Sequence, residues 1–152
     1  MSESDPAEDG YLAIVAHYED CLAKHGDSHL GVDWPNREDA LNRYRVMLGL
    51  LGPVAPDQQV SLLDFGCGAS HLYEYMVEHR LTGIEYSGLD LSEQFIALSR
   101  EKFPQNAYYC VDALAESATL PTVDYVVMAG WNSMPSMWDL ICPRRCCCRD
   151  AP

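Results

Sequence analysis

A glycine-rich turn that begins with a carboxylate is the first feature of this sequence that could do chemistry. Residues 64–70 read Asp-Phe-Gly-Cys-Gly-Ala-Ser and follow a short apolar run, so they join a predicted strand to a predicted helix. Glycine at Gly66 and Gly68 allows positive φ angles and lets a ligand approach the backbone without meeting a Cβ atom. Taken alone, the turn is either a ligand loop or a simple tight turn, because Ser70 stands in the place of a third glycine.

Two further carboxylates follow the next two predicted strands. Asp90 ends the segment 84–89, where an acidic side chain can accept hydrogen bonds from both hydroxyls of a ribose. Asp112 follows the segment 108–111 and could accept a hydrogen bond from an exocyclic adenine amine. Each has a plainer interpretation, since Asp90 could cap the next helix and Asp112 could be a solvated loop residue. Three consecutive strand ends with suitable chemistry nevertheless favour one shared binding site, because parallel sheets bind ligands beyond their carboxyl ends.

Four segments together resemble motifs I to IV of the class I S-adenosylmethionine-dependent methyltransferases. They read L-L-D-F-G-C-G-A-S over 62–70, S-G-L-D-L-S over 87–92, V-D-A over 111–113 and V-D-Y-V-V-M-A-G over 123–130. The resemblance covers 60–130 and implies S-adenosylmethionine as the cofactor, with S-adenosylhomocysteine as its product. The residues that it assigns to the cofactor are Asp64, Gly66, Cys67, Gly68, Asp90, Leu91, Asp112, Ala113, Ala129 and Gly130.

The resemblance also implies what these residues do. The glycine turn would wrap the methionine part of the cofactor, and Asp64 would orient the turn and the cofactor's ammonium group. Asp90 would bind the ribose, and Asp112 with Ala113 would flank the adenine. Residues after the fourth strand would line the face on which the methyl group is transferred.

The predicted function is a methyltransferase that depends on S-adenosylmethionine and acts on a small molecule or a protein, with a small molecule favoured. No catalytic residue is assigned, because the sulfonium is already an activated donor and the site mainly holds the reactants in line and dry. Two alternatives stay open. The chain could bind the cofactor or a partner without catalysis. It could also be a nicotinamide-dependent oxidoreductase, although this chain lacks the third glycine of that class and the class gives no role to Asp112.

Strands and helices alternate along the part of the chain that positions these residues. Periodicity predicts strands over 60–65, 84–89, 108–111 and 123–129, with helices over 70–80 and 92–103, the second capped by Ser92. Such alternation implies parallel pairing with right-handed crossovers. The predicted fold class is therefore α/β, a Rossmann-like parallel sheet with helices on both faces and an N-terminal helical cap.

The helical cap is predicted from two helices that precede the first strand. They cover 11–24 and 37–51, and Asn36 is the expected N-cap of the second. By the resemblance this cap lies over the cofactor, and Arg43 is included among the cofactor-binding residues. For Arg43 a solvated helix face is the plainer interpretation. The full set of candidates in the cap is His25, Trp34, Arg37, Arg43 and Tyr44.

The charge of the chain argues against nucleic acid as a partner. Asp and Glu number 23 against 10 Lys and Arg, a net charge of −13 that repels polyanions. No apolar stretch reaches the roughly 18 residues needed to span a bilayer, and no secretion signal precedes the acidic start. We therefore expect a soluble, cytoplasmic protein without a membrane partner.

Cysteine usage predicts neither disulfides nor a metal site. The chain has 7 cysteines, an odd number, and no secretion signal, which favours reduced thiols. Four of them crowd near the C-terminus without a C-x-x-C pair or a nearby histidine, so no zinc site is expected there. These four are Cys142, Cys146, Cys147 and Cys148.

The predicted organisation has four parts: a disordered acidic tail (1–10), the cap (11–52), the cofactor-binding core (53–130) and an irregular segment (131–152). Complete members of the resembled family continue through another helix and three more strands. We therefore expect a truncated chain whose ending is out of frame or alternatively spliced, with a sheet that is incomplete after its fourth strand. The open edge of that strand favours either a homodimer that buries it or a chain that is prone to aggregation.

Overall fold

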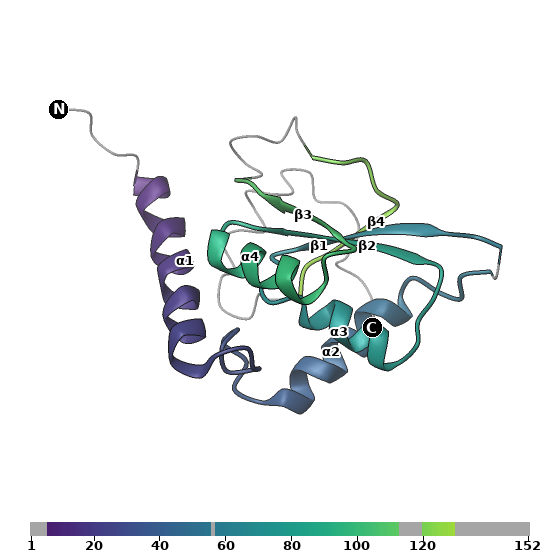
Figure 1. Ribbon diagram of the computed structural model, residues 1–152, viewed down its shortest axis with the longest axis horizontal. Coiled ribbons are helices and arrows are strands. Elements are labelled where there is room, and N and C mark those ends of the chain that lie inside the picture. The colour runs from purple at the N-terminus through teal and green to yellow at the C-terminus, as the bar shows by residue number, and fades with distance from the viewer. Residues whose placement is uncertain (1–5, 56, 113–119, 130–152) are drawn as a thin grey trace, which may run out of the picture.

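The computed structural model describes residues 6–55, 57–112 and 120–129, and within them the chain forms four helices and four strands (Figure 1). The helices are α1 (Pro6–His25), α2 (Arg37–Gly49), α3 (His71–Glu78) and α4 (Glu93–Lys102). The strands are β1 (Val60–Phe65), β2 (Ile84–Asp90), β3 (Ala107–Cys110) and β4 (Tyr125–Val127). From β1 to β3 strands and helices alternate, as the sequence predicts.

The four strands pair in parallel in one open sheet with the order β3-β2-β1-β4. β1 and β2 stay in register from the pair Val60 and Ile84 to the pair Phe65 and Leu89. α3 connects β1 to β2, and α4 connects β2 to β3. This arrangement confirms the predicted Rossmann-like α/β fold, and it brings the carboxyl ends of all four strands to one edge of the sheet.

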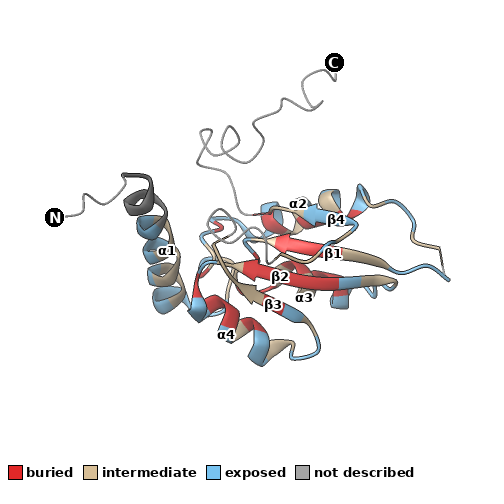
Figure 2. Ribbon diagram, turned by 90° about the horizontal axis from the view of Figure 1, so that it is seen from above, coloured by how far each residue is buried: buried red, intermediate tan, exposed pale blue. Residues whose placement is uncertain are grey.

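One face of the sheet is covered by α2, α3 and α4 (Figures 1 and 2). Alternate strand residues point to this face, and they pack on Leu72 and Met76 of α3 and Ile96 of α4. The helices were predicted on both faces. A helix for the opposite face would come from the connection between β3 and β4, where residues 113–119 lie outside those described. The strand residues of this core are Leu62, Tyr86 and Tyr108.

The element boundaries follow local signals. Asn36 caps α2, because its Oδ1 accepts a hydrogen bond from the Glu38 N–H at 2.9 Å. Ser92 caps α4 in the same way, accepting from the Phe95 N–H at 3.3 Å. α1 begins at Pro6, five residues earlier than predicted, since proline fits the first turn of a helix, where its missing N–H needs no partner. This helix therefore covers the second half of the segment predicted as a disordered tail.

Among the described strands, β4 lies at one edge of the sheet. The predicted end of the sheet after this strand concerns residues 130–152, which lie outside those described. β4 is three residues long, shorter than the predicted segment 123–129, and it pairs only with β1 among the described strands. Its residues Tyr125 and Val126 are exposed. Just before β4, Asp124 Oδ2 accepts hydrogen bonds from the Ser61 N–H and hydroxyl, each at 2.8 Å, which ties the start of β4 to β1.

Candidate cofactor site

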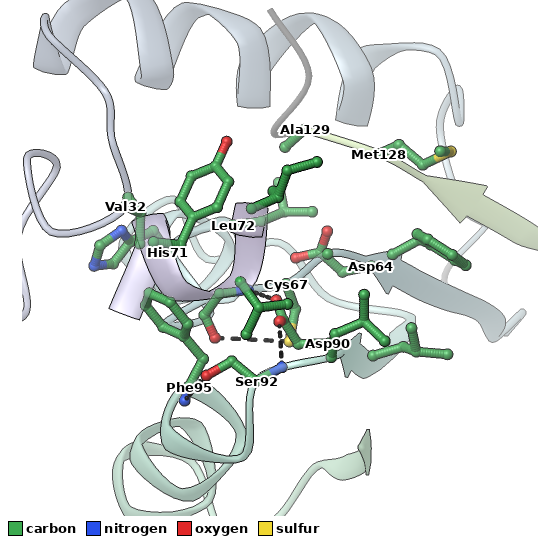
Figure 3. A pocket seen from close by; sticks show the side chains of 18 of the residues that line it. Val32, Asp64, Cys67, His71, Leu72, Asp90, Ser92, Phe95, Met128 and Ala129 are labelled. Carbon is green, nitrogen blue, oxygen red and sulfur yellow. Dashed lines mark hydrogen bonds between the residues drawn. The ribbon is translucent and has the colours of Figure 1, made fainter. Parts of the chain in front are cut away.

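A cavity of about 190 Å³ lies at the carboxyl ends of the strands (Figure 3). Its walls come from the strand ends and the loops that follow them, with α3 and α4 contributing His71, Leu72 and Phe95. The cap closes another side through α1 and the segment 26–36. The cavity lies where a Rossmann-like sheet binds its ligand. The cap residues that line it are Ile14, Val15, Tyr18, Val32, Trp34 and Tyr44.

The glycine turn after β1 has the backbone that its sequence predicts. Gly66 and Gly68 have φ angles of 76° and 50°, and the N–H groups of Gly66 and Cys67 donate to the Leu89 carbonyl at 2.8 and 2.9 Å. A Cβ atom at Gly68 would lie 3.3 Å from a methyl carbon of Val32, in the cavity. Glycine is thus required at this position for conformation and for space.

Ser70 takes the conformation that a third glycine would take. Its φ is 58°, a left-handed value that is uncommon for residues other than glycine, and its side chain is fully buried. Its Oγ donates to Ser99 Oγ at 2.9 Å, and Ser99 Oγ donates to the Gly68 carbonyl at 2.8 Å. These hydroxyls hold the back of the glycine turn. These two serines were not predicted as partners, because they are 29 positions apart and only the tertiary fold brings them together.

Asp90 lies at the end of β2 with its carboxylate at the cavity. Its Oδ2 accepts from the Gly68 N–H at 2.9 Å and its Oδ1 from the Ser92 N–H at 3.0 Å (Figure 3). Burial raises the pKa of Asp90 above its usual value, and these backbone hydrogen bonds oppose that rise. Each carboxylate oxygen has a second lone pair for a ligand hydroxyl. The cap role that the sequence analysis weighed for Asp90 is therefore compatible with ligand binding.

Asp64 has a buried oxygen that no group among the described residues satisfies. The side chain is 1% exposed, and its Oδ2 accepts a hydrogen bond from the Tyr86 hydroxyl at 2.9 Å. Its Oδ1 has no hydrogen-bond partner within the described residues, although Asp64 lines the cavity. Burial raises the pKa of Asp64 to about 7, a rise that the Tyr86 hydrogen bond opposes and the Asp90 charge reinforces. Because buried acceptors are seldom left unpaired, Asp64 Oδ1 is suited to a ligand that carries a donor or a positive charge.

The structure brings most of the predicted cofactor residues to one cavity. Ala113 and Gly130 lie outside the described residues. Arg43 is not in the cavity wall, where the sequence analysis placed it; its guanidinium donates to the Ala129 carbonyl at 3.0 Å and lies 5.0 Å above the Trp34 ring. It therefore supports two wall residues. The predicted residues that line the cavity are Asp64, Gly66, Cys67, Gly68, Asp90, Leu91, Asp112 and Ala129.

Of the candidate contact residues in the cap, some line the cavity and others do not. Trp34 and Tyr44 line the cavity, whereas His25 and Arg37 do not. Burial raises the pKa of Tyr44 well above its usual value, so it stays a neutral hydroxyl. The cap as a whole was predicted to lie over the cofactor, but the α1 residues that line the cavity were not among the candidates. The apolar residues of α1 had been recognised by their helical spacing, but that spacing does not show which structure the apolar face covers.

A second cavity, of about 280 Å³, adjoins the first. The two share the wall residues Trp34, Tyr44 and His71. The second cavity is more polar, with Glu74 and Glu78 of α3 on one side and Arg37 of α2 among the residues that line it. The two cavities therefore meet at these three side chains.

The parallel sheet, the glycine turn and the strand-end carboxylates define a Rossmann-like domain with a candidate ligand site at its strand ends. Residues 63–134 match the family model described as a methyltransferase domain. This match agrees with the predicted resemblance of the motifs to the class I methyltransferases. A search of curated protein sequences finds no match to the chain.

Solved structures of similar fold include several methyltransferases. A TehB-like SAM-dependent methyltransferase from Corynebacterium glutamicum is 21% identical, with a TM-score of 0.47 over 83% of this chain and 56% of its own. DesVI from Streptomyces venezuelae is 20% identical, with a TM-score of 0.45 over 84% and 44%. The plantazolicin methyltransferase BpumL, solved in complex with SAH, is 20% identical, with a TM-score of 0.47 over 80% and 49%. The chain thus spans about half the length of these structures, and likenesses of this size say nothing about its reaction.

The family match does not depend on the cap, whose helices lie outside the matched residues. Among the described residues, no helix is both long and apolar enough to cross a membrane.

Proposed function

We propose that this chain binds S-adenosylmethionine in the cavity at the strand ends and is a methyltransferase for a small-molecule acceptor. The single observation that carries the proposal is the unpaired Oδ1 of Asp64, buried in the cavity wall immediately before the glycine turn. The ammonium group of the cofactor is a donor with a positive charge, so it would satisfy both the hydrogen-bonding capacity and the charge of this carboxylate. The methyltransferase-domain match supports the same cofactor.

The other wall residues fit the remaining parts of that cofactor. The backbone of Gly66 and Gly68 leaves room for the methionine part, since a side chain at Gly68 would occupy the space beside Val32. Asp90 would accept hydrogen bonds from the ribose hydroxyls, and Asp112 is at the rim for the adenine amine. The apolar wall residues would exclude water from the bound molecule; they include Leu72, Leu89, Phe95, Val111 and Met128.

When bound, the cofactor supplies a methyl group that its sulfonium already activates. The residues of this chain therefore need only hold an acceptor in line and keep the site dry, and no side chain has to act as a base. The adjoining polar cavity has room for a small acceptor, which supports a small molecule over a protein. The net charge of −13 argues against a nucleic-acid acceptor.

A thermal-shift comparison of S-adenosylmethionine, S-adenosylhomocysteine and NAD tests the proposal. A ligand that binds only the folded chain raises its melting temperature with concentration. We expect both sulfur compounds to stabilise the chain and NAD to have no effect. Stabilisation by NAD alone would overturn the proposal in favour of a nicotinamide-dependent oxidoreductase.

Methyl transfer itself needs a second measurement. Incubation with S-adenosylmethionine labelled in its methyl group and a panel of small amines, alcohols and thiols should yield a labelled product and S-adenosylhomocysteine. A chain that binds both sulfur compounds tightly and transfers no label to any acceptor would instead be a cofactor-binding module without catalysis.

A further inference from the structure

Three side chains of the kinds that bind transition metals meet on the outer part of the cap. His17 and Cys21 are four residues apart on α1, so they lie on the same face of the helix. Asp33 comes from the segment between α1 and α2. His17 Nε2 lies 3.0 Å from Asp33 Oδ2 and 3.8 Å from Cys21 Sγ, and one ligand atom from each residue lies within 4.8 Å of the other two.

These distances are close to those within a tetrahedral zinc site. Zinc binds nitrogen, oxygen and sulfur at about 2.0 to 2.3 Å, which puts the ligand atoms about 3.3 to 3.7 Å from one another. The two distances from His17 lie within a few tenths of an ångström of that range. The side chains of His17 and Asp33 are 57% and 48% exposed, so they can rotate to bring Asp33 and Cys21 closer without disturbing the core.

The chemistry of the set selects the class of metal. An imidazole, a thiolate and a carboxylate suit zinc and its neighbours among the transition metals, whereas magnesium and calcium prefer oxygen ligands alone. The carboxylate of Asp33 attracts a cation, and a bound metal would displace the thiol proton of Cys21.

We propose that His17, Cys21 and Asp33 form a site for a divalent zinc-class metal ion, with the remaining coordination position open to solvent. No metal site was predicted from the sequence, where only the four cysteines near the C-terminus stand close enough together to suggest one. Cys21 and Asp33 are twelve positions apart, and only the turn of the chain after α1 brings them together. The plainer interpretation, a hydrogen bond between His17 and Asp33 alone, gives Cys21 no role.

The proposed site would fix the two parts of the cap that line the cofactor cavity. Tyr18 follows His17 on α1, and Val32 and Trp34 flank Asp33; all three line the cavity. A metal ion bound to both parts would hold them together and stabilise the folded chain through mass action. Metal binding itself does not depend on the proposed cofactor and can be measured without it.

The test uses the full chain with Cys142→Ser, Cys146→Ser, Cys147→Ser and Cys148→Ser as its background, since those thiols could bind metal on their own. Zinc is titrated by calorimetry under a reductant that does not bind metal. Cobalt(II) is the spectroscopic probe, because a cobalt ion with a thiolate ligand has a charge-transfer absorption that oxygen and nitrogen ligands do not give. Magnesium serves as the hard-cation control.

We expect the background chain to bind one zinc ion and to show the cobalt–thiolate absorption. His17→Ala, Cys21→Ser and Asp33→Ala should each weaken zinc binding by at least about tenfold, the loss typical even of residues that only support a ligand. Circular dichroism should show these surface variants to be folded. The matched controls, His25→Ala and Cys110→Ser, should bind zinc as the background does. No saturable zinc binding, or a cobalt–thiolate absorption that survives Cys21→Ser, would overturn the proposal.

Discussion

Replacing Asp64 with asparagine removes a buried negative charge while the side chain keeps its size. The pKa of Asp64 is raised from 3.8 to about 7 in the folded chain, chiefly by burial. Folded protein therefore binds the proton more tightly than unfolded chain does, and stability is lost as pH rises from about 4 to about 7. A shift of this size corresponds to a cost on the order of 4 kcal/mol above pH 7.

The asparagine variant should not lose this stability at high pH, because its side chain carries no charge. We expect Asp64→Asn to match the wild type in free energy of unfolding near pH 4 and to become the more stable of the two by pH 8, by up to about 4 kcal/mol. Urea denaturation of the chain without ligand, at several pH values, measures the difference. The same variant should bind S-adenosylhomocysteine roughly thirtyfold to a thousandfold more weakly, because the ammonium group would lose a charged partner worth about 2 to 4 kcal/mol.

Asp124→Asn is the matched control, since its pH dependence should have the opposite sign. Hydrogen bonds from the Ser61 backbone N–H and hydroxyl lower the pKa of this exposed carboxylate. Its contribution to stability is therefore present at neutral pH and is lost as pH falls through the lowered pKa. An Asp64→Asn variant that is no more stable than the wild type at pH 8 and binds S-adenosylhomocysteine unchanged would refute the reasoning for Asp64.

Three further predictions follow from the strand ends and the sheet edge. Asp90→Ala should cost about 2 to 4 kcal/mol in affinity for S-adenosylhomocysteine, measured by calorimetry on a variant with an intact fold. Gly68→Ala and Gly52→Ala should each lose about 1 kcal/mol of stability from their positive φ. Only Gly68→Ala should also lose binding of S-adenosylhomocysteine, because Gly68 lines the cavity and Gly52 does not. The exposed edge strand should associate into dimers or larger species on size exclusion with light scattering, and Val126→Lys should reduce this; a wild-type monomer would contradict the edge prediction.

Much of the fold could be predicted because its signals are local. The apolar runs over 60–65 and 84–89 match β1 and β2 within one residue, and Asn36 and Ser92 cap their helices by hydrogen bonds to the next turn. The strand-end carboxylates Asp64 and Asp90 could be placed together for the same reason, since parallel pairing aligns the ends of neighbouring strands.

What the sequence could not reveal depends on contacts between distant segments. The hydrogen bond from Tyr86 to Asp64 joins two residues on neighbouring strands that are not directly opposite each other. The spacing of apolar residues does not distinguish a tyrosine that makes such a bond from one that only fills the core. Arg43 shows the same limit: its place on α2 was right, but its partner is the Ala129 carbonyl 86 residues away. The cluster of His17, Cys21 and Asp33 likewise depends on the path of the chain after α1.

The most direct test of the central claim is a crystal structure of the chain grown with S-adenosylhomocysteine. We predict that the ligand lies in the cavity at the strand ends, with its ammonium group within hydrogen-bonding distance of Asp64 Oδ1. Its ribose hydroxyls should donate hydrogen bonds to the Asp90 carboxylate. A ligand bound elsewhere, or in this cavity with Asp64 Oδ1 still unpaired, would contradict this prediction.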